Sequence, residues 1–589
     1  MAKGIRVIAL AKELGVLSRD ILEKLRIEGQ GDKATSAQNT LTVGLADTVR
    51  EWFRHAHSPA ATAVETAAPV PEEAPPAMQK SSRLKKCDWD SEEYHRWLQQ
   101  HGPVRGSLKT VPVIRAMTIG GFKSICLPVT IPLRAITLLY GPNSAGKSSI
   151  IHAIHYATEY LNTGLHDLND TRSGGSSVHL GGFRNIVHRH DPKGVITLGF
   201  DVSPGNHLRN DLGIAGPGET ASIDPGYAVN LKIDVSGLTE YCLALADEPL
   251  AIWRKEKVVT GFGHQPMIER GTLYVNACHP AFSVWPHSLS QGGEELLGLG
   301  EWCKGFGEPD PQKKGWRLMP FVFGGPTIQA QPLRGHREAA LGQLLQGPLT
   351  NLARILGRSQ YVGPLRSVPP RDWSSIGDHA DPATGLAAWR DLARTSDRAM
   401  LDRVNRWLTS GEHFDTGYRI EGGPYHHVLI DGRNGDIAVG VADVGKGIAQ
   451  VVPVIVAALR HEASLLMLEQ PELHLHPRGQ AVIGDLLSEF RIESSLASSS
   501  SPATSGVALV ETHSECLVLR LMKRIRQTAT GQLPNGMPQI RPEHVAVLYV
   551  KPQGDAGARV VELRLDDKGD FIDRWPDGFF DEQAEELLS

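Results

Sequence analysis

The sequence predicts an α/β fold built around a phosphate-binding loop, with an inserted antiparallel β lobe and a small N-terminal helical domain on a flexible linker. Three observations predict this organisation. Residues 141–148 read Gly-Pro-Asn-Ser-Ala-Gly-Lys-Ser, which fits the pattern G-x-x-x-x-G-K-[ST]. An apolar run at 135–140 precedes this loop, and a helical pattern follows it. Two further apolar runs, at 464–469 and 507–510, are typical of buried parallel strands.

The composition indicates a soluble protein with more than one domain. The chain has 589 residues, which exceeds the usual size of a single hydrophobic core. The net charge of -5 argues against a generally basic surface, so any contact with nucleic acid needs a local patch. The six cysteines are scattered without a C-x-x-C pair, which suits a reducing compartment. Because no secretory signal or long apolar run is visible, we expect a cytoplasmic protein without membrane contact.

Residues 1–54 are predicted to form a small helical docking domain. Apolar residues recur at helical spacing from Val7 to Leu14, and Ser18 is suited to cap a second helix that contains Leu22 and Leu25. The segment resembles the small N-terminal domain of bacterial translation initiation factor 2. The resemblance implies a module that docks onto protein or nucleic acid, without translation activity. A plain three-helix bundle with no specific ligand is the alternative.

The remaining chain divides into a linker and one large domain. Residues 55–110 are rich in Pro and Ala and carry one short helical pattern, which is typical of a flexible linker. Residues 111–589 are predicted to form the large domain. Within it, residues 175–340 alternate β-type runs with turn residues, such as the runs at 195–202 and 227–235. We expect these runs to form the antiparallel lobe.

The loop at 141–148 predicts an ATP site. Its glycines let backbone N–H groups close around phosphate oxygens, and the following helix adds its positive N-terminal end. Lys147 can reach the β- and γ-phosphates, and Ser148 can hold Mg²⁺. The residues expected to bind the nucleotide are Gly141, Asn143, Ser144, Ala145, Gly146, Lys147, Ser148 and Ser149.

Two other strand ends carry candidate residues of the same site. The run at 464–469 ends in Glu469, in the way that a buried parallel strand presents a carboxylate to Mg²⁺. The run at 507–510 leads into Glu511-Thr-His-Ser514, and this places His513 at a strand end. The predicted metal ligands are therefore Ser148 and Glu469.

A Gly-rich turn at 443–450 opens an apolar helix at 451–459. We expect Pro453 to lie in the first turn of this helix, where its missing N–H has no helical partner. The N-terminus of the helix is a second anion site. A dinucleotide-type turn and a merely structural turn are the alternatives, but no strand runs directly into it.

Together these four pieces resemble the ABC-type ATPase heads of the OLD-like class, which are related more distantly to SMC proteins. The residues at 361–366, 466–477 and 574–581 are close to that class. The resemblance implies that ATP is sandwiched between the P-loop of one protomer and the signature helix of another. It assigns Gly445, Lys446, Gly447 and Gln450 to the signature, Mg²⁺ binding through water to Glu469, and sensing of the γ-phosphate to His513. Lys446 replaces a common Ser and is suited to contact the partner's γ-phosphate.

The sequence departs from this family pattern after Glu469. The next residue is usually a glutamate that acts as the general base, and here it is Gln470. Loss of a general base costs roughly 10²–10⁴ in rate, although a glutamine can still orient the attacking water. We therefore predict tight ATP binding and slow hydrolysis, with Gln470 either native or an engineered trap. Glu472 is disfavoured as a substitute base, because Pro471 is expected to direct the chain away from the strand end.

The resemblance implies a dimerising switch in bacterial defence against phage, which controls a separate effector such as a nuclease or toxin. No nuclease motif follows His513, and the acidic residues at 566–570 are better explained as a hairpin turn. An SMC-like ATPase in DNA repair or maintenance is the alternative, although no coiled-coil pattern lies between Lys147 and Asp443. A translation-linked binding protein is a third reading. The spacing between the P-loop and the signature disfavours a transporter ATPase.

Overall fold

The computed structural model describes most of the large domain and little of the N-terminal region. The described residues are 5–6, 40–41, 49, 114–163, 178–202, 226–245, 248–256, 268–279, 308–324, 329–330, 336–371, 375–395, 397–423, 426–460, 464–496, 506–554 and 557–576. The chain divides into two compact units, Met1–Lys86 and Cys87–Ser589. In the first unit, β1 (Ile5–Arg6) pairs antiparallel with β2 (Thr40–Leu41). The helices expected in 1–54 and the linker expected at 55–110 otherwise lie outside the described residues.

A six-stranded sheet forms the centre of the second unit. Its order is β14 (Ser359–Val362), β18 (Leu465–Glu469), β19 (Val507–Glu511), β5 (Ile136–Tyr140), β20 (Val545–Pro552) and β21 (Ala558–Leu563). All neighbouring pairs are parallel except β20 and β21. The strands that the sequence predicted at 135–140, 464–469 and 507–510 are confirmed to within one residue.

This sheet separates two hydrophobic cores. Because neighbouring residues of a strand point to opposite faces, Leu138 packs into one core and Leu139 into the other. Leu468 and Met467 of β18 divide in the same way. Every residue of β5, β18 and β19 is buried. Burial on both faces explains why these strands are continuous apolar runs rather than alternating ones.

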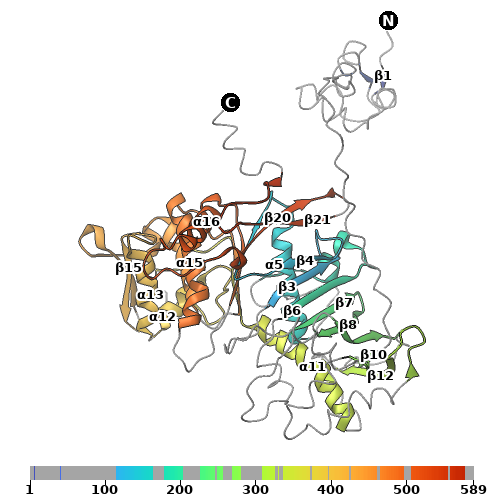
Figure 1. Ribbon diagram of the computed structural model, residues 1–589. Helices are drawn as coiled ribbons and strands as arrows, with labels where there is room; N and C mark the ends of the chain where they lie inside the picture. Colours follow the sequence, from blue (N-terminus) through green and yellow to red (C-terminus); the bar gives the residue numbers. More distant parts are fainter. Residues whose placement is uncertain are drawn as a thin grey trace. The chain divides into compact units, whose positions relative to one another are not determined.

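An antiparallel sheet adjoins the first core. Its order is β11 (Glu308–Pro309), β12 (Trp316–Gly324), β10 (Ile268–Asn276), β9 (Glu248–Lys255), β8 (Gly237–Leu245), β7 (Tyr227–Asp234), β6 (Ile196–Val202), β3 (Ile114–Gly120) and β4 (Val129–Pro132), with β13 (Gln329–Ala330) beside β12. The expected lobe is therefore present, but it also includes β3 and β4, which precede the P-loop. Helices α5 (Lys147–Thr163) and α11 (His336–Gly357) pack together beside this sheet (Figure 1).

The second core lies under a group of helices and a small sheet, at the left of Figure 1. The helices are α12 (Leu386–Arg394), α13 (Arg398–Thr409), α14 (Lys446–Leu459), α15 (Pro477–Leu496) and α16 (Glu515–Ala529). The sheet contains β15 (Tyr418–Gly423), β16 (His426–Asp431) and β17 (Ile437–Val439). Short helical segments connect these elements: α6 (Phe183–Ile186), η4 (His188–His190), η7 (Gly432–Asn434), η8 (Val441–Asp443) and η9 (Pro542–His544).

Helix α14 begins earlier than the sequence suggested. Gly445 is its N-cap and Lys446 its first residue, so Pro453 lies about two turns inside the helix. The prediction that Pro453 occupies the first turn was therefore wrong. A proline in a helix interior leaves the carbonyl four residues earlier, that of Ala449, without its helical donor. The helix forms nevertheless because all its residues from 448 to 459 are buried in the second core.

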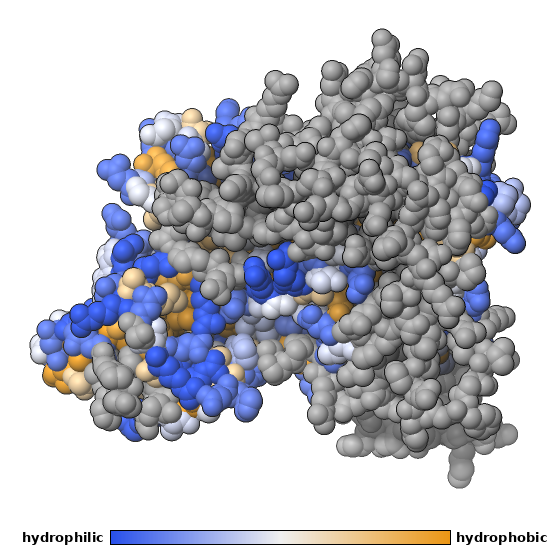
Figure 2. Space-filling model, turned by 90° about the horizontal axis from the view of Figure 1, so that it is seen from below, coloured by the Kyte–Doolittle hydropathy of each residue, from blue (hydrophilic) through white to orange (hydrophobic). Residues whose placement is uncertain are grey.

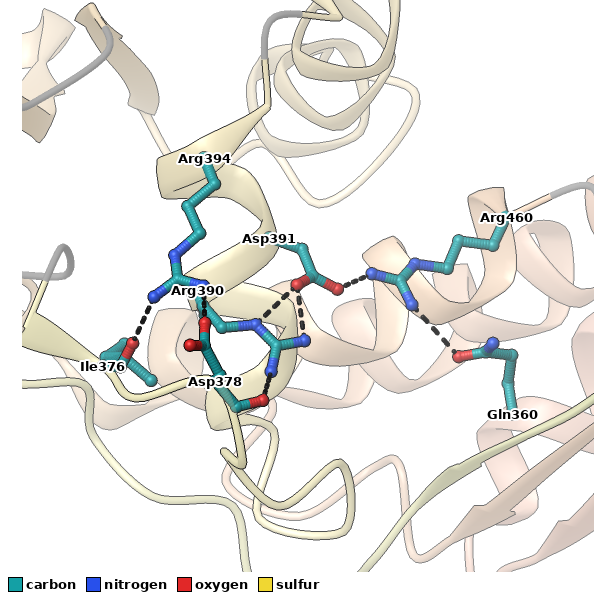
Figure 3. A network of polar contacts seen from close by, with 7 residues as sticks. All are labelled: Gln360, Ile376, Asp378, Arg390, Asp391, Arg394 and Arg460. Atoms are coloured by element: carbon teal, nitrogen blue, oxygen red, sulfur yellow. Dashed lines mark hydrogen bonds and ion pairs between the residues drawn. The ribbon is translucent and has the colours of Figure 1, made fainter.

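Polar contacts fix α12 to its neighbours (Figure 3). Asp391 of α12 forms ion pairs with Arg390 of the same helix and with Arg460 at the end of α14. Arg460 also donates to Gln360 of β14. Helix α12 is therefore connected to the helix whose N-terminus carries the predicted signature.

One face of the molecule is mixed in polarity where its residues are described. On the face drawn in Figure 2, hydrophilic side chains alternate with small hydrophobic areas. None of the helices in the described residues combines the length and hydrophobicity needed to cross a bilayer.

Candidate functional site

The P-loop connects the carboxyl end of β5 to the N-terminus of α5, as the sequence predicted. Gly141 and Gly146 have φ angles of 138° and 108°, which favour glycine. A Cβ atom at Gly141 would lie 2.2 Å from the carbonyl oxygen of Val550, and one at Gly146 would lie 2.2 Å from Ser124 Oγ. Both glycines are therefore required by close packing as well as by backbone conformation.

Lys147 is the first residue of α5 and is buried. Its Nζ donates to the carbonyl oxygens of Gly141 and Pro142 at 3.0 and 2.9 Å. It also lies 4.0 Å from Glu511 Oε1. Burial lowers the pKa of Lys147, and the charge of Glu511 opposes this shift. The ammonium group thus folds over the P-loop, where a phosphate would meet it.

Ser148 donates its hydroxyl to Glu511 Oε2 at 2.7 Å. The sequence predicts a metal site made of Ser148 and Glu469, without Glu511. Glu511 ends β19 and lies in register with Glu469 at the end of β18. The carboxylate in contact with the P-loop serine is therefore on the strand next to β5. Only the strand order could have identified it, since the sequence does not say which strand adjoins β5.

Glu469 is buried beside this pair. Tyr361 donates to its Oε1 at 2.9 Å, and His152 Nε2 lies 3.9 Å from the same oxygen. Burial raises the pKa of Glu469 to about 7, and repulsion from Glu511 adds to this effect. Burial also raises the pKa of Glu511. Two crowded carboxylates are relieved when a cation binds them.

The donor set fits Mg²⁺. A serine hydroxyl and two carboxylates supply oxygen ligands, and Mg²⁺ commonly takes one or two carboxylates together with water and phosphate oxygens. Within the described residues, no group of three or more His, Cys, Asp or Glu side chains is arranged to hold a metal by itself.

Gln470 has a left-handed backbone with φ of 45°. This conformation is uncommon for a residue other than glycine and is maintained by surrounding contacts. The backbone N–H of Gln470 donates to the Glu511 carbonyl at 2.7 Å, and its own carbonyl accepts from Arg366 Nη2 at 3.0 Å. The residue at the predicted general-base position is thus fixed from two sides.

The half-buried His513 and the buried Glu472 lie side by side just beyond the end of β19. The backbone N–H of His513 donates to Glu472 Oε1 at 2.7 Å. Among the described residues, neither His513 Nε2 nor Glu472 Oε2 has a hydrogen-bond partner. Burial lowers the pKa of His513, and the charge of Lys147 contributes. Pro471 was expected to direct Glu472 away, but the chain turns back and places this carboxylate beside His513.

The four predicted signature residues divide into two groups. Gly445 and Lys446 are exposed and Gly447 is half-buried at the start of α14, next to a groove of about 320 Å³. Gln450 lies one turn further on and is buried. Its side-chain oxygen accepts a hydrogen bond from Arg366 Nε at 3.2 Å, and its side-chain nitrogen donates to the backbone carbonyl of Arg366 at 2.6 Å. Gln450 therefore faces the interior of the protomer rather than a second copy.

The other predicted nucleotide-binding residues surround the loop. Asn143 and Ser144 are exposed at its tip, while Ala145 is buried in the first core. Ser149 is buried, and its hydroxyl lies 3.1 Å from that of Ser124. The acidic residues near the C-terminus form the expected turn, in which Asp566 Oδ1 accepts from the backbone N–H groups of Lys568 and Asp570.

Comparisons with known families identify two segments. Residues 116–211, which include the P-loop, match the model of the family described as AAA domain. Residues 540–589 match the model described as Protein of unknown function (DUF3696). A search among curated proteins found no match.

Several solved structures also resemble the chain. The SMC head domain from Thermotoga maritima is 12% identical, with a TM-score of 0.32, over 77% of this chain and 100% of that one. A SmcHead bound to the C-winged helix domain of ScpA is 10% identical, with a TM-score of 0.34, over 77% and 98%. The Smc head domain with an extended coiled coil from Pyrococcus furiosus, bound to the C-terminal domain of ScpA, is 11% identical, with a TM-score of 0.33, over 81% and 99%. The P-loop geometry and the AAA domain match together indicate a nucleotide-binding domain of the ATPase type.

Proposed function

We propose that this protein is an ATP-binding and slowly hydrolysing ABC-type ATPase, two copies of which close on ATP and Mg²⁺ to act as a switch. The observation that carries the proposal is the meeting of Lys147, Ser148 and Glu511. These residues come from the P-loop and from a strand more than 350 positions away, and they lie within 4.0 Å of one another. This arrangement supports the proposal, because a P-loop lysine, a P-loop serine and a nearby carboxylate are the groups that would bind a magnesium triphosphate.

Each group has a defined task in the proposed site. The P-loop N–H groups and the N-terminus of α5 bind phosphate oxygens. Lys147 exchanges its two carbonyl partners for the β- and γ-phosphates. Ser148, Glu511 and Glu469 would hold Mg²⁺, directly or through water. When bound, this cation neutralises charge that develops on the phosphates.

Slow hydrolysis follows from Gln470. Its amide can orient a water molecule but does not take a proton at neutral pH. The contacts from Arg366 and Glu511 fix its backbone at the end of β18. His513, whose buried Nε2 has no hydrogen-bond partner within the part of the chain that the structure describes, would sense the γ-phosphate from the end of the neighbouring strand.

A second copy completes the site in this proposal. Gly445 and Lys446 are exposed at the N-terminus of α14, which is a favourable place for an anion. Lys446 would meet the γ-phosphate bound to the partner's P-loop. His474 and His476 lie beside the same groove and would contact the partner subunit.

We propose bacterial defence against phage as the biological role, with a separate nuclease or toxin as the effector. This role rests on the resemblance of residues 361–366, 466–477 and 574–581 to OLD-like ATPases. The N-terminal module would tether the effector or a nucleic-acid trigger. The alternative, an SMC-like role in DNA repair or maintenance, is less well supported, because strands β6–β12 occupy much of the span between Lys147 and Asp443.

The first test is the variant Lys147→Ala. It should abolish ATP binding, because the variant loses the only side-chain cation that the P-loop directs at the phosphates. Binding is measured by isothermal titration calorimetry with ATP and Mg²⁺, and protection is measured by plaque counts in a host expressing the protein. Lys193→Ala, at an exposed turn, is the control. Normal ATP binding by Lys147→Ala would refute the ATP site, whereas lost binding with full protection would refute ATP-dependent defence.

A further inference from the structure

Arg366 is a buried arginine that joins three separate segments. It follows β14 in the chain, and its side chain is almost completely inaccessible to solvent. Its Nε donates to Gln450 of α14 at 3.2 Å. Its Nη2 donates to the Gln470 carbonyl at 3.0 Å, and its Nη1 donates to the carbonyls of Gly363 and Glu469 at 3.1 and 3.4 Å.

These contacts use the full geometry of a guanidinium group. Arginine presents five N–H donors in a rigid planar fork, whereas lysine presents one compact ammonium group. Burial lowers the pKa of Arg366 to about 10, so the side chain stays charged at neutral pH. A buried charge is costly unless hydrogen bonds compensate it, and here the acceptors are one side-chain amide and three backbone carbonyls.

The two regions that Arg366 connects, Gln450 of α14 and the end of β18, have different surroundings. Gln450 lies one helical turn from Lys446, on a helix whose residues from 448 onward are all buried. Because the helix is firmly packed, a displacement of the α14 N-terminus would also displace Gln450. At the other end, Glu469 is the last residue of β18, and Gln470 follows it with a left-handed backbone. Arg366 contacts both Gln450 and the backbone of Glu469 and Gln470 directly.

We propose that Arg366 is a positioning residue that couples the two ATP sites of the dimer. The inference rests on the proposed function. In each subunit α14 would contact the partner's nucleotide, whereas Glu469 and Gln470 serve the subunit's own nucleotide. Through Gln450, Arg366 makes the position of Gln470 at one site depend on occupancy of the other.

The test compares cooperativity rather than activity alone. The full-length chain, Arg366→Lys and Gln450→Met are assayed for ATPase rate against ATP concentration, and ATP binding is measured in parallel. With two coupled sites, the Hill coefficient of the unmodified protein should approach about 2 and that of each variant about 1. ATP binding should survive in both variants. Arg394→Lys, which alters a half-exposed arginine on α12 that donates to the Ile376 carbonyl, should keep the cooperativity of the unmodified protein.

The outcomes separate this inference from the proposed function. Failure of the unmodified protein to bind ATP would refute the proposed function itself. If it hydrolyses ATP with a Hill coefficient of about 1, or if the variants keep its cooperativity, the coupling role of Arg366 is refuted while the ATPase stands. Should Arg366→Lys not fold, Gln450→Met decides alone, because it removes the amide and leaves the arginine with its backbone acceptors. Equal loss of cooperativity in Arg394→Lys would also overturn the assignment.

Discussion

At the scale of single residues, Gln470 determines how the proposed site works. It follows Glu469 directly, and its backbone is held by Arg366 and by the Glu511 carbonyl. Its side chain has nearly the size and shape of glutamate but lacks a basic carboxylate at neutral pH. In the proposed site, hydrogen bonds hold the backbone of Gln470 in place, whereas its side chain offers no proton acceptor.

The lack of a proton acceptor predicts the effect of Gln470→Glu. The substitution adds a general base without changing side-chain length, so ATP turnover should rise by roughly 10²-fold or more. Steady-state phosphate release with saturating ATP and Mg²⁺ measures the change. Gln532→Glu, at an exposed position, adds the same charge elsewhere and should have no effect. Unchanged turnover in Gln470→Glu would show that the general base lies on another residue.

The sequence predicted the P-loop but missed two residues that complete the site. Lys147 and Ser148 were identifiable because their roles depend on a local motif. Glu511 was visible only as a strand end, and its contact with Ser148 depends on the adjacency of β5 and β19. Arg366 depends on even longer-range packing. Gln450 was assigned to the nucleotide because the sequence does not indicate which side of α14 faces the interior.

At the scale of elements, a buried ion pair holds α15 and α16 together. Asp485 of α15 is fully buried between Arg520 and Arg524 of α16, with contacts of 2.6 and 2.7 Å. Asp485→Asn should lower the free energy of unfolding by about 3 kcal/mol or more, because it leaves buried arginine charge uncompensated. Urea unfolding of the full chain measures this.

The matched control for Asp485 is Asp570→Asn, which breaks an exposed pair with Arg526. Exposed pairs contribute less than about 1 kcal/mol, so this variant should unfold almost like the unmodified protein. Equal destabilisation by both substitutions would mean that burial of the Asp485 pair has no special importance for packing of α15 on α16.

The elements themselves were predicted to different accuracies. The strands β5, β18 and β19 are buried on both faces, so the apolar runs in the sequence begin and end where the strands do, to within one residue. The start of α14 was misplaced by five residues, because glycines and a lysine do not resemble the first turn of an apolar helix. Burial of the helix outweighs the low helix propensity of Gly447 and Pro453.

At the scale of the whole molecule, the proposed dimer depends on the exposed end of α14. Lys446→Glu should abolish ATP-dependent dimerisation, because it places a negative charge where the partner's γ-phosphate would lie. ATP binding by the single protomer should persist, since the P-loop is untouched. Light scattering after gel filtration, with and without ATP and Mg²⁺, measures the dimer. Lys193→Glu carries the same charge reversal at a distant exposed turn.

A dimer that forms normally with Lys446→Glu would exclude the α14 N-terminus from the interface. The proposed sandwich would then need another surface, although the intramolecular site around Lys147 and Glu511 would remain. The experiment therefore tests the proposed dimer interface separately from the proposed nucleotide site within one protomer.

The closeness of Gly141 to the Val550 carbonyl has a consequence for C-terminal truncation of the chain. Val550 belongs to β20, so the floor beneath the P-loop is supplied by the last quarter of the sequence. A chain that ends before residue 540 would keep all the residues of the P-loop motif. It would lose β20, the strand against which Gly141 packs. Strand β20 therefore shapes the P-loop together with the loop's own glycines.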